Sequence, residues 1–192
     1  MGLKKGQVAD VVVSDLAIGG KGLAKIDGLP IFIDHAVPLD HVTIRIVKKK
    51  KKYAEARVIA LLEPSPYRIA PRCEYSGFCG GCKWQFLEYS RQLEYKRQHV
   101  ADALAHIGLI HDVPVLPVIP SPDVFRYRNK MEFSCSDQRW LLPHELGDES
   151  MTKGFGLGLH VPGTFNKIID ISKCYLQFGH PTRIEDNISK YR

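Results

Sequence analysis

Three cysteines with a characteristic spacing stand within ten residues of one another: Cys73, Cys79 and Cys82. Three glycines of the same segment lie among them. Glycine lets a backbone turn tightly and brings its amides close to sulfur, as in loops that wrap around an inorganic centre. Three thiolates from one loop would need a fourth ligand from elsewhere in the chain.

Two further cysteines are candidates for that fourth ligand, Cys135 and Cys174. Cys135 alternates with Met131 and Phe133, a period of two that is typical of a strand with a packed core thiol. Cys174 follows an apolar, strand-like run, where a chain leaving a sheet can point a thiol outward. We therefore expect a structural role for Cys135 and a four-thiolate site made of Cys73, Cys79, Cys82 and Cys174.

Several kinds of cysteine site are open at this point. An odd number of cysteines and the lack of a signal peptide argue against a disulfide framework. Structural zinc usually takes two C-x2-C pairs, whereas this chain has one such pair. The spacing favours an iron–sulfur cluster, with structural zinc as the stronger rival.

The charge of the chain indicates a polyanionic partner. The 192 residues carry a formal net charge of +6, and residues 1–60 hold eleven lysines and arginines against six acids. A basic lobe of this kind suggests nucleic acid. No apolar run is long enough to span a membrane, so no membrane partner is expected. Thiols without a targeting sequence favour the cytoplasm.

Residues 1–62 read as five short strands with glycine and proline between them, which predicts a small OB-like β-barrel. Five consecutive lysines, Lys48 to Lys52, fall between the last two of these strands. A solvated hairpin tip is the plain reading of such a run. Because the excess charge gathers on this lobe, we instead expect the lysines to contact phosphates.

One clear helix is predicted after the cysteine segment, from Glu88 to Ile107. Ser90 is a candidate cap for its first turn, and Gly108 is a natural stop. Its apolar stripe consists of Leu93, Val100, Leu104 and Ile107.

The remaining third of the chain reads as β-rich. Residues 126–130, with cations, a tyrosine and an amide, can hold phosphate and stack on a base. We predict a hairpin of residues 131–136 with residues 139–142, and strands at 154–160 and 167–171. The glycines of residues 154–158 lack the ending of a phosphate loop and indicate close packing in a strand. The fold class is thus mixed β and α+β.

Taken in order, these motifs resemble the N-terminal part of a known family. They are the basic barrel, the C-x5-C-Gly-Gly-C segment, residues 125–133, residues 158–163 and residues 170–177. The family is the iron–sulfur, TRAM-domain RNA (uracil-5-)-methyltransferases, which mostly act on 23S ribosomal RNA. The resemblance covers nearly the whole chain.

The resemblance implies a domain layout and a cofactor. It implies a TRAM domain over residues 1–62, a cysteine loop with its helix over 63–112, and part of a central RNA-binding domain over 113–192. It also implies a [4Fe-4S] cluster on the four thiols, shaping a surface for ribosomal RNA rather than transfer RNA. The protein is expected to be a monomer. The residues expected to contact RNA are Lys48, Lys49, Lys50, Lys51, Lys52, Arg126, Tyr127, Arg128, Asn129 and Lys130.

The chain departs from the family in one large respect. The family's methyl-transfer chemistry lies in a C-terminal domain that binds S-adenosylmethionine, with a cysteine that attacks C6 of uracil. Neither feature is visible here, so we expect no catalytic or S-adenosylmethionine-binding residue in this chain. We expect it to be a piece of a longer enzyme that binds RNA without methylating it. The alternatives are a stand-alone, metal-stabilised RNA-binding module and, less favoured by the spacing, a radical enzyme.

Overall fold

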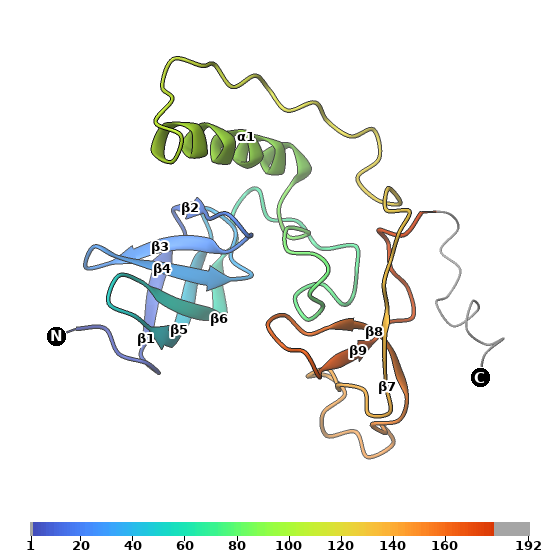
Figure 1. Cartoon of the computed structure of the whole chain (residues 1–192). Helices are drawn as coiled ribbons and strands as arrows, with labels where there is room; N and C mark the ends of the chain where they lie inside the picture. The colour runs from blue at the N-terminus through green and yellow to red at the C-terminus, as the bar shows by residue number, and fades with distance from the viewer. Residues whose placement is uncertain (1, 179–192) are drawn as a thin grey trace. The chain divides into compact units, whose positions relative to one another are not determined.

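The computed structural model describes residues 2–178 as a mostly β structure with one α-helix (Figure 1). Its elements, in chain order, are β1 (Val8–Val12), β2 (Asp15–Leu16), β3 (Gly22–Ile26), β4 (Leu29–Asp34), β5 (His41–Lys49), β6 (Ala54–Glu63), α1 (Tyr89–His106), β7 (Ser134–Ser136), β8 (Gly156–His160) and β9 (Ile168–Asp170). The first six strands form one sheet and the last three form another. No helix among the described residues is both long and apolar enough to cross a membrane.

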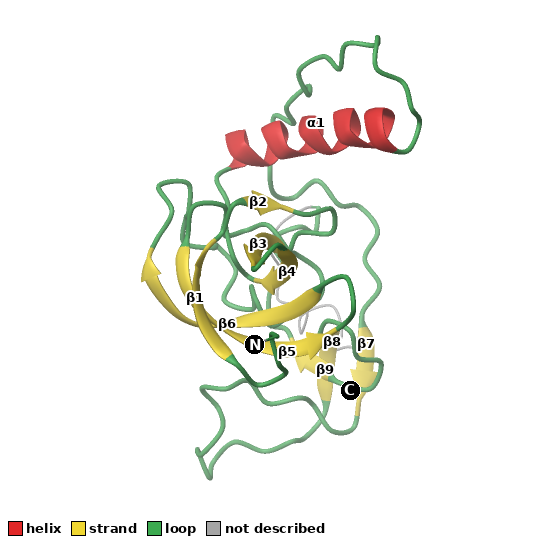
Figure 2. Ribbon diagram, turned by 90° about the vertical axis from the view of Figure 1, so that its left-hand side faces the viewer, coloured by secondary structure: helices red, strands yellow, loops and turns green. Residues whose placement is uncertain are grey.

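The first sheet has the strand order β1-β5-β6-β4-β3-β2 and curves strongly (Figure 2). All neighbours are antiparallel except β4 and β6, which pair in parallel. Side chains alternate between the two faces of this sheet, so that β5 buries Val42, Ile44 and Ile46 and turns Arg45 outward. The inward side chains of five strands meet in a single apolar cluster. The five expected strands are present, with the two-residue β2 in addition.

A buried carboxylate secures the chain that leaves this sheet. Asp40 is fully buried and accepts hydrogen bonds from the backbone N–H groups of Val37, at 2.7 Å, and Ser65, at 2.9 Å. The Nε of Arg68 donates to the same carboxylate at 2.9 Å. Because a buried charge is tolerated only when paired and hydrogen-bonded, these contacts hold the segment after β6 in place.

Helix α1 occurs where the apolar periodicity predicted it, but it packs through different residues. None of its residues is fully buried, and Val100 and Ile107 of the predicted stripe are 51% and 80% exposed. The contacting face instead includes Gln92, which donates to two backbone carbonyls, and His99, whose Nε2 lies 2.6 Å from the carbonyl oxygen of Leu16. The stripe therefore indicated the helix correctly and its packing face wrongly.

The predicted ends of the helix also need correction. The N-cap residue is Glu88, whose side chain makes no capping hydrogen bond, and Ser90 lies inside the helix. Gly108 follows the helix, but the residue in the left-handed region is Leu109, with φ of 53°. The N–H of Ile110 closes the end by donating to the carbonyl of Leu104.

The second sheet has the antiparallel order β7-β8-β9. The predicted hairpin of residues 131–136 with 139–142 is wrong, because β7 pairs with β8 and residues 139–142 form no strand. Trp140 instead donates its N–H to the carbonyl of Ile168. The glycines of β8 do serve close packing, since a Cβ on Gly158 would stand 2.0 Å from the carbonyl oxygen of Ile169.

The chain divides into two compact units whose limits differ from the three expected segments. The first unit holds residues 1–70 and 83–120, and the second holds residues 71–82 with the chain from Ser121 onward. The cysteine loop and helix α1, which were expected to share a segment, thus belong to different units. The loop joins the second unit because Tyr75 is buried against its apolar cluster and bonds Ser172 through its hydroxyl, at 3.0 Å. The polar stretch 183–192 lies outside the described residues.

Candidate metal centre and nucleic-acid interface

The cysteine loop is shaped by short backbone hydrogen bonds and by glycines. The carbonyl of Tyr75 accepts from the N–H of Cys79 at 2.8 Å, and Gly77 occupies the left-handed region with φ of 93°. The N–H of Gly80 donates to the carbonyl of His160 at 2.9 Å, where a Cβ would lie 2.9 Å from that oxygen. Only glycine allows this approach, so the loop is fixed against the end of β8.

Three of the predicted ligands pack, half-buried, against one apolar cluster of the second unit: Cys73, Cys79 and Cys174. The N–H of Gly81 donates to the Sγ of Cys79 at 3.3 Å, which is the amide-to-sulfur contact expected of such a loop. Burial raises the pKa of Cys79 to about 11 against the opposing effect of that N–H. Burial is likewise the main reason why the pKa of Cys73 is raised.

Cys73 and Cys79 lie within electrostatic reach of the other predicted thiols. The charges of Cys82, Cys73 and Cys174 contribute to the raised pKa of Cys79 after burial and the Gly81 N–H. Those of Cys82 and Cys174 contribute in the same way at Cys73. Within residues 2–178, no three His, Cys, Asp or Glu side chains converge as ligands of a single metal ion.

The residues present fit an iron–sulfur cluster in the chemistry of their donors. The set consists of thiols alone, one of which already accepts a backbone N–H, and hydrogen bonds to sulfur are a regular feature of cluster sites. A metal group would have to displace the protons of its thiol ligands, which burial holds more firmly on Cys73 and Cys79. Cys73, Cys79, Cys82 and Cys174 are therefore the side chains that could hold it.

Cys135 is not the core thiol that its alternation with Phe133 predicted. It is exposed, and its neighbours Ser134 and Ser136 are the half-buried residues of β7. The short strand begins only at Ser134, so the alternation read from Met131 had the wrong phase.

The segment of residues 126–130 pairs directly with the segment that carries Cys174. Arg126 and Arg128 donate their N–H groups to the carbonyls of Tyr175 and Leu176, both at 2.9 Å. Phe178 returns a hydrogen bond to the carbonyl of Arg128 at 2.8 Å. All five side chains of residues 126–130 are exposed, Tyr127 by 55%. The exposed cations and the fourth predicted ligand are thus carried on two irregular segments joined by backbone hydrogen bonds and one isolated β-bridge.

A cation between two aromatic rings adds to this connection and was missed from the sequence. The guanidinium carbon of Arg72 lies 5.2 Å from the ring centroid of Phe125 and 4.8 Å from that of Tyr175. The two rings meet edge to face at 6.3 Å. A signal was present, since these three residues are direct sequence neighbours of Cys73, Arg126 and Cys174.

The five lysines were predicted to lie between β5 and β6, but only the last three of them do. Lys48 and Lys49 end β5, and residues 50–52 form the turn. The Nζ of Lys48 forms an ion pair with the carboxylate of Glu55 at 3.1 Å. The Nζ of Lys21 forms a second ion pair with the same carboxylate at 3.2 Å. Hydrogen bonds from Lys48 and Lys21 lower the pKa of Glu55. The turn residues, rather than Lys48, therefore offer the uncommitted positive charge of this run.

Comparisons with known proteins agree with this arrangement. The TRAM domain model matches residues 2–59. A protein of Porphyromonas gingivalis described as an uncharacterised RNA methyltransferase is 42% identical over 168 residues, 85% of this chain and 36% of its own length. A protein of the same description from Chlorobaculum tepidum is 42% identical over 177 residues, 90% of this chain and 37% of its own. The chain belongs to the family of TRAM-domain RNA methyltransferases.

The chain spans somewhat more than a third of the length of these family members. A solved structure shares its fold over 95% of this chain and 36% of the other, with a TM-score of 0.59 and 23% identity. That structure is of the tRNA (uracil-54, C5)-methyltransferase of Pyrococcus abyssi in complex with S-adenosyl-L-homocysteine.

The TRAM domain carries a second basic feature that the sequence reading missed. Arg45 of β5 and Arg57 of β6 are directly opposite each other on the outward face, and both are exposed. Like charges across a strand pair repel. Within the described residues neither arginine has an ion-pair partner, so this face presents two cations that an anion would stabilise.

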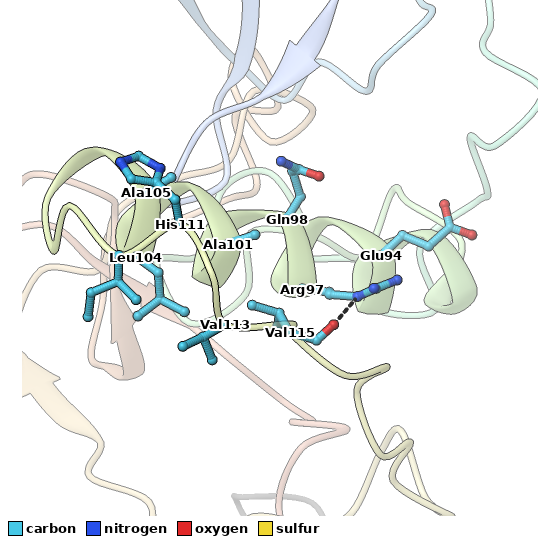
Figure 3. A pocket seen from close by; sticks show the side chains of 10 residues that line it. Glu94, Arg97, Gln98, Ala101, Leu104, Ala105, His111, Val113 and Val115 are labelled. Carbon is cyan, nitrogen blue, oxygen red and sulfur yellow. Dashed lines mark hydrogen bonds between the residues drawn. The ribbon is translucent and has the colours of Figure 1, made fainter.

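Outside the TRAM match, the chain has an open groove of about 470 Å³ along α1 (Figure 3). One wall is the helix face that includes Arg97, Ala101 and Leu104, and the other is residues 110–115. The Nε of Arg97 donates to the carbonyl of Val115 at 2.8 Å and closes one end. None of the predicted site residues lines it.

Proposed function

We propose that this chain is the RNA-binding and cluster-bearing portion of an S-adenosylmethionine-dependent RNA (uracil-5-)-methyltransferase that acts on 23S ribosomal RNA. The observation that carries the proposal is the gathering of four thiols in one unit, with the Cys174 segment paired to the exposed residues 126–130. The names of the relatives support the RNA methyltransferase part of this proposal, and the fold shared with a tRNA uracil-5-methyltransferase supports the type of reaction.

The chain's own residues bind and position RNA in this proposal. The guanidinium groups of Arg126 and Arg128 hold phosphates, and the exposed ring of Tyr127 stacks on an unpaired base. Both arginines are oriented by backbone bonds to residues 175 and 176. A [4Fe-4S] group on the four thiols would supply a rigid link between the cysteine loop and the Cys174 segment. The exposed lysines of residues 49–52 add contacts that depend on salt.

Methyl transfer itself belongs to the remainder of the longer protein. Covalent addition of a cysteine to C6 would make C5 of uracil nucleophilic, and the target base must leave its stack to be reached. In this proposal, this chain holds the RNA loop open and positions its target base for the methyl-transfer site of the longer protein.

Metal analysis of chain purified without air tests the cluster. About four irons and four sulfides per chain are expected. Cys174→Ala should lose most of the iron. Cys135→Ser is the matched control, because Cys135 is exposed and apart from the other thiols, and it should keep the iron. One zinc and no iron would overturn the cluster and favour a stand-alone, zinc-stabilised RNA-binding module.

Binding and labelling experiments test the remaining parts of the proposal. Fragments of 23S ribosomal RNA should bind more tightly than transfer RNA at matched salt, and the reverse order would overturn the assignment of the substrate. With labelled S-adenosylmethionine, this chain alone should leave the RNA unlabelled. Labelled RNA would show that a catalytic residue lies within these 192 residues.

A further inference from the structure

The turn between β8 and β9 holds an aromatic ring almost entirely in solvent. Phe165 is 91% exposed, although it belongs to a side-chain type that folded proteins usually bury. Its ring is not part of the apolar cluster that packs the second unit. Packing among residues 2–178 therefore does not account for a phenylalanine at this position.

The turn is fixed in a way that presents this ring. Thr164 donates to the carbonyl of Val161 through its N–H, at 3.1 Å, and its hydroxyl, at 2.9 Å. The N–H of Val161 donates to the carbonyl of Lys167 at 2.9 Å. Gly163 adopts φ of 73°, where a side chain would be strained. Three hydrogen bonds and one glycine thus hold the ring outward.

A second ring lies alongside Phe165. His160 stacks with it at a centroid distance of 5.8 Å and an interplanar angle of 22°. His160 is itself held, since its Nε2 lies 2.9 Å from the hydroxyl of Ser134 and its carbonyl accepts from Gly80 of the cysteine loop. The orientation of Phe165 is thereby supported from a fixed element.

The surroundings of the ring suit a nucleic acid. The Nζ of Lys167, two residues on, lies 3.9 Å from the ring centroid of Trp140, which is itself 43% exposed. Exposed rings beside a cation are the combination that holds unpaired bases and their phosphates. An apolar protein partner would require a contiguous apolar patch, and Lys167 and Asn166 interrupt one here.

We propose that Phe165 is a stacking platform for an unpaired RNA base, carried on the β8–β9 turn. This inference rests on the proposed RNA-binding function and adds a contact separate from residues 126–130. Stacking tolerates any base because every base has a π-face, so the contact would hold a splayed loop without reading its sequence.

A fluorescent base tests the proposal. Short single-stranded RNAs with one 2-aminopurine are titrated with the full chain and with Phe165→Leu, Phe165→Trp and Leu146→Ala. Phe165→Leu keeps much of the apolar surface but removes the ring, so we expect affinity to fall on the order of tenfold. Phe165→Trp should bind within about twofold of the parent and quench the fluorescence. Leu146, 64% exposed in another loop of the same unit, is the matched control and should have little effect.

The outcomes separate the inference from the function on which it rests. If the parent chain binds no RNA, the proposed function fails. If the parent binds and Phe165→Leu binds equally well, the function stands and the stacking platform is wrong. If Phe165→Trp is as weak as Phe165→Leu, the contact depends on shape rather than on an aromatic face, which also overturns the proposal. Unchanged thermal midpoints are expected in all variants, because the side chain is exposed.

Discussion

The guanidinium carbon of Arg72 lies 4.8 Å from the ring centroid of Tyr175, so the residue before Cys73 contacts the residue after Cys174. This contact joins the two segments of the cysteine site through protein side chains alone. Since Arg72 also lies over Phe125, it joins the start of the exposed basic segment to the same point. The spacing of the first and fourth predicted ligands is thereby set before any metal group binds.

Removal of the Arg72 side chain should loosen this arrangement. Arg72→Ala is expected to destabilise the second unit by about 0.5–2 kcal/mol, the range for a cation over aromatic rings, and to weaken RNA binding. Thermal unfolding and RNA titration measure the two effects. Arg72→Lys keeps the charge but loses the planar stack, so it should recover only part of both.

A variant that removes the same charge elsewhere controls for phosphate attraction. Lys153 is exposed in the same unit, and Lys153→Ala should leave the thermal midpoint unchanged. If Arg72→Ala and Lys153→Ala gave the same thermal midpoint and the same RNA affinity, Arg72 would act only as a surface charge and its contact with the two rings would not stabilise the unit.

The buried carboxylate of Asp40 should be among the most sensitive positions of the first unit. Asp40→Ala leaves Arg68 and two backbone N–H groups without their acceptor, which is expected to destabilise the unit by about 3–5 kcal/mol. Urea unfolding followed by circular dichroism gives the change in free energy of unfolding. Asp27→Asn, at an exposed turn residue whose φ of 49° asparagine tolerates, should change it by less than about 0.5 kcal/mol.

Gly154 and Gly158 should respond very differently to substitution by alanine, although they lie only four positions apart in the same glycine-rich segment. A Cβ on Gly158 would stand 2.0 Å from the carbonyl oxygen of Ile169, so Gly158→Ala must push β8 away from β9. We expect a loss of at least about 3 kcal/mol, or failure of the second unit to fold. A Cβ on Gly154 would meet only the Oγ1 of Thr152, at 3.6 Å, so Gly154→Ala should be nearly neutral. Equal midpoints for the two variants would show that β8 and β9 do not pair in this register.

The stability of the second unit should depend on pH through Glu145. Burial alone would raise the pKa of this carboxyl, but the N–H of Leu142 and the guanidinium of Arg139 outweigh it and lower the pKa below its ordinary value. A carboxyl with a depressed folded pKa stabilises the fold fully above its unfolded pKa, and this stabilisation is lost as pH falls through the folded pKa.

Glu145→Gln is therefore expected to destabilise the unit at neutral pH by about 1–3 kcal/mol and to flatten the decline of its midpoint below about pH 4.5. The exposed Glu149 gives the control, and Glu149→Gln should keep the decline of the parent chain. If the midpoint of Glu145→Gln fell with pH as steeply as that of the parent chain, other carboxyls would be the cause of the acid sensitivity.

Local periodicity accounts for the elements that the sequence predicted well. In β5, apolar residues at every second position predicted both the strand and its buried face. This worked because one side of the curved sheet is covered along the length of the strand. The four-thiolate site read from the spacing of Cys73, Cys79 and Cys82 and from the place of Cys174 stays a prediction.

Features that depend on distant parts of the chain could not be read in this way. The partner of β7 is β8, twenty residues further along, whereas local proximity suggested residues 139–142. Cys135 followed the right period but the wrong phase, because β7 begins only at Ser134 and turns Ser134 and Ser136, not Cys135, to its half-buried side. Phe165 was missed because nothing in its local sequence distinguishes a presented ring from a buried one, and Arg72 was missed although it is the direct neighbour of Cys73.

The passage of residues 71–82 into the second unit, and of residues 83–120 back into the first, has a genetic consequence. A single recombination event between two genes exchanges everything on one side of one point. Wherever that point falls between residues 71 and 120, it leaves at least one unit assembled from two parents. To take each unit from a different parent, a gene would need three crossovers, one at each point where the chain passes between the units, although each unit packs around a core of its own.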